Sequence, residues 1–207
     1  MYLERNTDRQ FDFIWMVKNA VVPRPIAWVG TVSPDGVGNL APYSYFNLVT
    51  MDPPTLMISF IGQKDSYDNL RASGDFVVNL VTDGLIDVET DSAAILPPED
   101  DEAELLGLAT VPSVQVGPPR LAAAKVALEC VFDREFELHG AHVVIGEVVA
   151  VHAADDVLDG TGRIDIARYR PVGRLGGALY TTVVDEVRVP VPEATPEWLA
   201  AVQARVP

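Results

Sequence analysis

The segment HVVIGEVVAVH at residues 142–152 is apolar on both of its alternating faces. One set of alternate positions holds Val143, Ile145, Glu147, Val149 and Val151, and the other holds His142, Val144, Gly146, Val148, Ala150 and His152. Side chains of a β-strand alternate between two faces, so a strand with nearly continuous apolarity meets protein on both. We therefore expect this segment to lie in a barrel or at a subunit interface.

Short β-rich segments separated by proline and glycine make up most of the chain. Residues expected to form further strands are 26–32, 55–61, 76–81, 124–132 and 134–138. Turns are expected at Ser33-Pro34-Asp35-Gly36 and at Asp52-Pro53-Pro54. Many short strands with few long helices predict a mainly β protein, a barrel with added helices. A doubly wound α/β fold is disfavoured because the chain has neither GxGxxG nor GxxxxGK[ST].

Helices are expected in three places. Residues 64–74 carry cap candidates at Asp65 and Ser66 and a closing Gly74, which predicts a short helix. Residues 83–120 are expected to leave the sheet as helix and loop; their first part, 83–104, has nine acidic residues and no basic one. A last helix is predicted with Thr195 as N-cap and Pro196 at its first position. We favour packing of that helix on its own domain over binding of a partner.

Net charge, cysteine content and the distribution of apolar residues exclude several classes of protein. The formal net charge is −15, with 15 Lys and Arg against 30 Asp and Glu, so a nucleic-acid partner would be repelled. A single cysteine, Cys130, cannot form an internal disulfide and is expected to be packed on a strand. We find no signal peptide and no segment near the ~18 apolar residues needed to cross a membrane. A cytoplasmic protein is the expectation.

Catalysis by side chains alone has few candidates in this sequence. There is no GxSxG and no HExxH motif. His139 and His142 are three residues apart, and a strand or turn would point them in different directions, so a metal site is poorly supported. A bound organic cofactor is the better hypothesis.

The segment GQKDSYDN, residues 62–69, is suited to holding an anion. Lys64 and Ser66 stand where a helix begins, and the first N–H groups of a helix lack internal partners. Asp65 and Asn69 would order the turn. From the local pattern alone, an ordinary helix cap beside a surface lysine is the slightly favoured interpretation.

The segment NLAPYSYFN, residues 39–47, carries no charge and is rich in hydrogen-bonding groups. Ser44 and Asn47 could bind the edge of a flat heteroaromatic ring, with Tyr45 or Phe46 as a wall. The alternative is that these aromatic residues are core. Only one predicted strand separates this segment from residues 62–69, so both could border one cleft.

The chain resembles a known family in five segments, which occur in the family's order. They are RPIAWVGTVSPDGVGNLAPYSYFN (24–47), DPPTLMISF (52–60), KDSYDNLRASGDFVVNLV (64–81), GEVVAVH (146–152) and GRLGGALYT (173–181). These segments resemble the flavin reductase-like family of FMN-binding split barrels, which includes flavoredoxin and the flavin reductases that feed two-component monooxygenases. The resemblance implies a six-stranded antiparallel Greek-key barrel with flanking helices, acting as a homodimer with FMN near the interface. Residues 1–207 would form one domain, with its core at about 20–182 and a tail at 183–207.

The resemblance also implies site residues. Val29, Gly30, Thr31, Ser44, Tyr45, Phe46 and Asn47 would line the flavin ring, and Ser59, Lys64, Asp65 and Ser66 would surround its phosphate. His142 matches a histidine near the flavin in some members and is the catalytic candidate. Arg174, Gly176, Gly177 and Tyr180 would border the site. The family often has Thr-Thr where this chain has Gly30-Thr31, and a threonine in place of Ser66.

The implied function is an NAD(P)H-dependent flavin reductase that transfers a hydride from NAD(P)H to N5 of FMN. A monooxygenase or another acceptor would take the electrons. The alternative is a flavoredoxin-like carrier that keeps FMN and passes electrons to a protein partner, which the acidic segment 83–104 could steer. A barrel that has lost its flavin is the third hypothesis.

Overall fold

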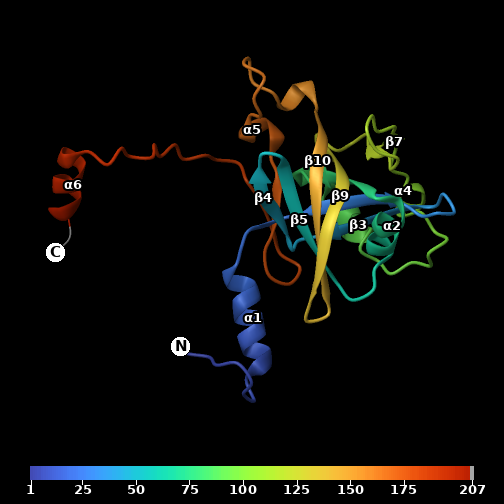
Figure 1. The fold of residues 1–207 in the computed structure, drawn as a ribbon, viewed down its shortest axis with the longest axis horizontal. Coiled ribbons are helices and arrows are strands. Elements are labelled where there is room, and N and C mark those ends of the chain that lie inside the picture. Colours follow the sequence, from blue (N-terminus) through green and yellow to red (C-terminus); the bar gives the residue numbers. More distant parts are fainter. Residues whose placement is uncertain (206–207) are drawn as a thin grey trace.

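The computed structural model describes residues 1–205 and builds them around one antiparallel sheet (Figure 1). The strand order is β3-β2-β6-β9-β10-β5-β4. The bounds are β2 Ala27–Val32, β3 Gly38–Tyr43, β4 Phe46–Met51, β5 Pro54–Ile61, β6 Asp75–Leu80, β9 Val126–Leu138 and β10 Ala141–Ala153. The two end strands, β3 and β4, are consecutive in the chain, so the sheet curls until its ends meet. The expected antiparallel barrel is confirmed, with seven strands in its main sheet instead of six.

The remaining elements surround this barrel. Short strands are β1 Arg24–Pro25, β11 Val172–Arg174 and β12 Tyr180–Thr182 in one sheet, and β7 Thr110–Val111 and β8 Arg120–Leu121 in another. Helices are α1 Gln10–Ala20, α2 Asp65–Ser73, α3 Ile86–Asp91, α4 Glu102–Leu105, α5 Ile166–Tyr169 and α6 Pro196–Gln203, with single 3-10 turns η1 Asp83–Leu85 and η2 Asp155–Val157. Within residues 1–205, no helix has the length and apolarity needed to cross a membrane.

The core lies inside the barrel, where alternate side chains of each strand point inward. Leu56, Ile58 and Phe60 of β5 are fully buried and belong to one cluster with Phe76 and Cys130. Burial of Cys130 confirms its packed role. A second cluster covers the other face of β2 around Trp28, so β2 is buried on both faces, which explains its continuous apolar sequence.

Strand β9 is one continuous strand, although its sequence predicts two. Its pairing with β10 shifts register between Phe132 and Arg134, so Asp133 forms a β-bulge at the place where the pattern is interrupted. Opposite this bulge lies Gly146, where an added Cβ would come within 2.6 Å of the Phe76 ring. The glycine therefore lets the ring pack against the strand.

Burial along β10 differs between its two halves. Val143 and Val144 are buried, as the apolar pattern predicts. Val149 and Val151 are exposed in the single chain. The expectation that both faces meet protein is thus confirmed for the first half of β10 only.

A buried carboxylate holds the loop before β8 against β9. Glu129 is fully buried and accepts hydrogen bonds from the backbone N–H groups of Val114 and Gln115 at 2.6–3.1 Å. His152 Nε2 lies 2.5 Å from the same carboxylate. Burial alone would raise the pKa of Glu129, but these hydrogen bonds together hold the pKa below its ordinary value.

The C-terminal segment leaves the body of the protein. Figure 1 shows the chain after β12 running away from the sheet to α6. The predicted cap is confirmed, since Thr195 Oγ1 accepts a hydrogen bond from Trp198 N at 3.2 Å. The prediction that α6 packs on its own domain is wrong, because the proline-rich residues before it form no turn that would bring it back.

Candidate functional site

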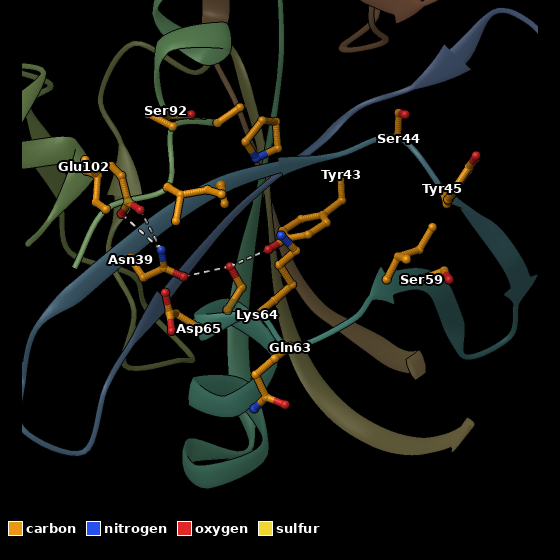
Figure 2. A pocket seen from close by; sticks show the side chains of 18 residues that line it. Asn39, Tyr43, Ser44, Tyr45, Ser59, Gln63, Lys64, Asp65, Ser92 and Glu102 are labelled. Carbon is orange, nitrogen blue, oxygen red and sulfur yellow. Dashed lines mark hydrogen bonds between the residues drawn. The ribbon is translucent and has the colours of Figure 1, made fainter. Parts of the chain in front are cut away.

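A cavity of about 490 Å³ opens beside the start of α2 (Figure 2). Its size lies within the range of about 300–1,000 Å³ that is typical of small-molecule sites. Its walls come from the corner between β3 and β4, from β5, and from the segment after α3. The lining consists of Asn39, residues 41–45, Ser59, Ile61, residues 63–66, residues 92–96 and Glu102.

Helix α2 begins in this cavity without a side-chain cap. Its N-cap is Lys64 and not Asp65 or Ser66, so the predicted caps are wrong, while Gly74 ends the helix in the left-handed conformation as expected. No acceptor in the described chain takes the N–H groups of Asp65 and Ser66. Helices α1 and α3 also lack a side-chain cap, whereas side chains cap α4, α5 and α6. The start of α2 therefore retains the free donors that an anion needs.

Lys64 supplies positive charge at the same place. It is the one cation among the residues that line the cavity, and within residues 1–205 its ammonium group forms no ion pair and no hydrogen bond. The half-buried hydroxyl of Ser59 has no hydrogen-bond partner among the described residues either. Lys64, Ser59 and the start of α2 can therefore bind one anionic group together.

Next to Lys64 and the start of α2, four side chains form a hydrogen-bond chain (Figure 2). Tyr43 donates to Ser66 Oγ at 3.0 Å, Ser66 donates to Asn39 Oδ1 at 2.7 Å, and Asn39 Nδ2 donates to both oxygens of Glu102 at 3.0 Å. Burial raises the pKa of Tyr43 to about 12, which keeps its hydroxyl protonated as a donor. The hydroxyl proton of the buried Ser66 is already engaged by Asn39, so the donor that Ser66 leaves free for a ligand is its backbone N–H.

Glu102 places a negative charge at the far end of the chain. Its buried carboxylate also accepts from Leu40 N at 2.8 Å, and all its hydrogen-bond donors are neutral. The cavity wall therefore carries one cation, Lys64, and two carboxylates: Asp65 beside it at the start of α2, and Glu102 near the segment after α3. Sequence reasoning missed Asn39, Tyr43 and Glu102 as site residues.

The corner between β3 and β4 separates the two aromatic candidates. Tyr45 lines the cavity and is 41% exposed, whereas Phe46 is 8% exposed and belongs to the barrel core. Ser44 lines the cavity beside Tyr45. Asn47 lies outside it and accepts a hydrogen bond from Leu48 N. Of the two aromatic candidates, Tyr45 therefore faces the cavity and Phe46 the core.

Arg24 is a buried cation beside this corner that sequence reasoning did not select. Its Nε lies 3.4 Å from Ser44 Oγ, and its guanidinium carbon lies 5.9 Å from the Tyr45 ring centre. The other guanidinium nitrogens donate at 2.8–2.9 Å to the carbonyl groups of Lys18, Val21 and Leu175. Among the described residues no carboxylate forms an ion pair with Arg24, so its charge acts on the cavity corner uncompensated. The only signal in the sequence is an arginine directly before Pro25.

Several predicted site residues lie outside the cavity. Val29 is fully buried in the core, and Gly30 and Thr31 border a separate cavity of about 30 Å³. The ring of His142 stacks on Tyr67, with ring centres 4.1 Å apart. The structure therefore gives these four candidates no contact with the main cavity.

The predicted residues of segment 173–181 form a cluster of their own away from the cavity lining. Arg174 stacks over Tyr180 at 4.3 Å and donates to the Gly177 carbonyl at 2.8 Å. Tyr180 donates to Glu89 Oε2 at 3.1 Å, and burial raises the pKa of Glu89. Gly176 packs so tightly that a Cβ there would overlap the Asn19 side chain. These contacts fasten the loop before β12 to α3 and α1.

The geometry of fold and cavity can be compared with known proteins. The profile of the family described as flavin reductase like domain matches residues 19–171. An uncharacterized protein from Aquifex aeolicus is 38% identical over 181 residues, which cover 85% of this chain and 92% of that protein.

Two solved structures have the same architecture over nearly the whole chain. Nitrilotriacetate monooxygenase component B from Bacillus cereus superposes with a TM-score of 0.85 at 30% identity, covering 91% of this chain and 98% of that one. A candidate flavin reductase with a split barrel domain from Shewanella frigidimarina superposes with a TM-score of 0.81 at 18% identity, covering 91% of this chain and 100% of that one. The second likeness concerns the fold alone, and it confirms the expected split barrel.

Proposed function

This chain belongs to the flavin reductase like family, and from that premise we propose that it is an NAD(P)H-dependent FMN reductase. One observation carries the proposal: the uncapped start of α2, with the unpaired Lys64, opens into the same cavity as Ser44 and Tyr45. An anion cradle and a ring-sized aromatic wall in one cavity fit the two ends of a flavin mononucleotide.

The residues at the α2 side would hold the phosphate of FMN. Lys64 offers a charge-assisted hydrogen bond, and the N–H groups of Asp65 and Ser66 add the positive end of the helix dipole. The free hydroxyl of Ser59 completes the set. These groups have no partners among the described residues, which is the pattern expected of donors reserved for a ligand.

The corner between β3 and β4 would hold the flavin ring. Bound FMN supplies the acceptor of a hydride from NAD(P)H and passes the electrons on. Tyr45 forms a wall for the ring, and Ser44 offers a hydroxyl that Arg24 orients. The buried charge of Arg24 stabilises additional negative charge at this corner, because a fixed cation in a dry site acts more strongly than one in water.

The exposed second half of β10 supports a homodimer. Val149 and Val151 are apolar and uncovered in one chain, and a second copy would bury them. Since a structural relative is a monooxygenase component, we also propose that an oxygenase accepts the electrons.

Titration with FMN tests the assignment directly. We expect saturable quenching of flavin fluorescence and FMN-dependent oxidation of NADH or NADPH by the purified protein. Absence of FMN binding would refute the proposal. Tight binding without NAD(P)H oxidation would favour the electron carrier instead.

A further inference from the structure

The C-terminal arm, defined as residues 184–205, carries apolar side chains that its own body leaves uncovered. Val187, Val189 and Val191 are 78–93% exposed. At the end of the arm, Trp198 and Leu199 of α6 are exposed as well. Figure 1 shows the arm running away from the sheet along its whole length. Uncovered apolar residues that recur along one segment are typical of a surface that binds protein.

The body has a matching uncovered surface. Strand β4 is the last strand of the main sheet, and its exposed side chains include Leu48, Val49 and Met51. With Val149 and Val151 of β10 they form what we call the β4–β10 apolar surface, whose five residues are 40–69% exposed. An uncovered edge strand of this kind favours association with another chain.

The pairing register places the two parts of this surface at the same end of the sheet. Glu147 of β10 pairs with Thr55 of β5, and Thr55 pairs with Thr50 of β4. Val149 and Val151 follow Glu147 by two and four residues, while Met51 follows Thr50 directly. Met51 of β4 and Val149 and Val151 of β10 therefore lie toward the same end of the sheet, on either side of β5.

The arm departs from the side of the body that carries this surface. Strand β12, which precedes the arm, pairs with β11, β11 pairs with β1, and β1 contacts β4. Figure 1 shows β4 on the side toward which the arm extends. Since the arm points outward from there, it cannot fold over the surface of its own chain without reversing its course.

A second copy docked on the β4–β10 apolar surface would lie beneath the arm. In a two-fold dimer each chain offers the same patch, so each arm can cross the other body. An extended segment of 12 residues, 184–195, spans at most about 40 Å, enough to cross a neighbouring barrel. We propose that the C-terminal arm of each chain packs on the β4–β10 apolar surface of a second copy of this chain. The inference rests on the proposed homodimer and adds the segment that holds it together.

Removing the arm tests its contribution to assembly. A chain ending at Val183 should have a dimer dissociation constant at least about tenfold higher than the full chain, since burial of even one valine side chain is worth about that factor. Sedimentation equilibrium measures the constant. Val114→Ser is the matched control, because Val114 is an exposed valine in a loop away from the arm, and it should leave the constant unchanged. An unchanged constant in the shortened chain would overturn the proposal.

A second measurement identifies the surface on which the arm lies. Cys130 is fully buried, and burial raises the pKa of its thiol, so a spin label on a Val191→Cys variant attaches at residue 191 alone. The labelled chain is mixed with isotope-labelled full chain that carries no spin label. We expect paramagnetic broadening of amide signals from residues 48–51 and 149–151 of the unlabelled copy. Broadening confined to other residues, or none, would overturn the proposal even if the shortened chain failed to fold.

The experiments on the arm can be distinguished from a test of the proposed reductase function. The residues that line the cavity all lie between Asn39 and Glu102, outside the arm. Failure of the full chain to bind FMN would refute the function and leave the broadening experiment unaffected. Failure of the broadening experiment with normal FMN binding would refute the arm exchange alone.

Discussion

Replacing Glu102 with glutamine tests the polarity of the hydrogen-bond chain behind the cavity. In the native chain every donor points toward the carboxylate, from Tyr43 through Ser66 and Asn39 to Glu102. A glutamine amide would face the amide of Asn39 with a second donor. Asn39 would have to turn over, after which Ser66 would donate to Tyr43 and the Tyr43 proton would point to the cavity.

Two effects of opposite sign follow from Glu102→Gln. The free energy of unfolding should fall by about 1–2 kcal/mol, because charge-assisted hydrogen bonds to Asn39 and Leu40 become neutral ones. FMN should bind more tightly, because one negative charge leaves the cavity wall. A sphere of about 490 Å³ is about 10 Å across, and two charges at that distance repel by roughly 0.8 kcal/mol at an effective dielectric constant of ~40. The expected gain in FMN affinity is therefore about fourfold.

Urea unfolding measures the first effect and fluorescence titration with FMN the second. The matched control is Glu104→Gln, which removes the same charge from an exposed position of α4 and should change stability by less than about 0.5 kcal/mol. Weaker FMN binding by Glu102→Gln would refute our assignment of the cavity charges. Unchanged stability would refute the hydrogen-bond chain.

Three further predictions concern charge. Lys64→Ala should weaken FMN binding by on the order of 1–3 kcal/mol in titration. Lys125→Ala, which removes a charge outside the cavity, should leave FMN binding unchanged. Equal losses of affinity in the two variants would contradict the assignment of Lys64 to the phosphate. With Lys64 engaged by FMN, no lining cation remains for the 2′-phosphate of NADPH, so kcat/KM should be higher with NADH than with NADPH. The ratio of the two kcat/KM values should shrink as the salt concentration rises, because salt screens charges. A preference for NADPH would refute the reasoning. Because the pKa of Glu129 is lowered in the folded state, its stabilising effect is present above the ordinary carboxyl pKa and lost as pH falls through the folded value. Urea unfolding between about pH 5 and pH 3 should show that loss, and Glu129→Gln should flatten it.

Much of the fold could be predicted because its strands follow local apolar patterns. The segments 26–32, 55–61 and 76–81 each match a strand to within one residue. The division of β9 at Asp133 came from a bulge, which interrupts the pattern without ending the strand. Helix α1 was not anticipated, because Arg9 before it offers no cap and its apolar residues, none of them buried, follow no single face.

The site could be predicted only where its signals are local. Lys64 and Ser44 stand in short segments with recognisable chemistry, and both line the cavity. Asn39 and Glu102 are 63 residues apart in the chain, and only the packed fold makes them partners. Arg24 was missed for the same reason, since its contacts come from distant segments such as Leu175.

Gly146 has a consequence for how freely this sequence can vary. The Phe76 ring occupies the space that any larger side chain at position 146 would need, and a Cβ there would lie 2.6 Å from its Cζ. Substitution at 146 thus requires a compensating change at 76, which makes the two positions a coupled pair although they stand 70 residues apart. In a saturation library selected for folding, larger residues at position 146 should appear only together with smaller ones at position 76.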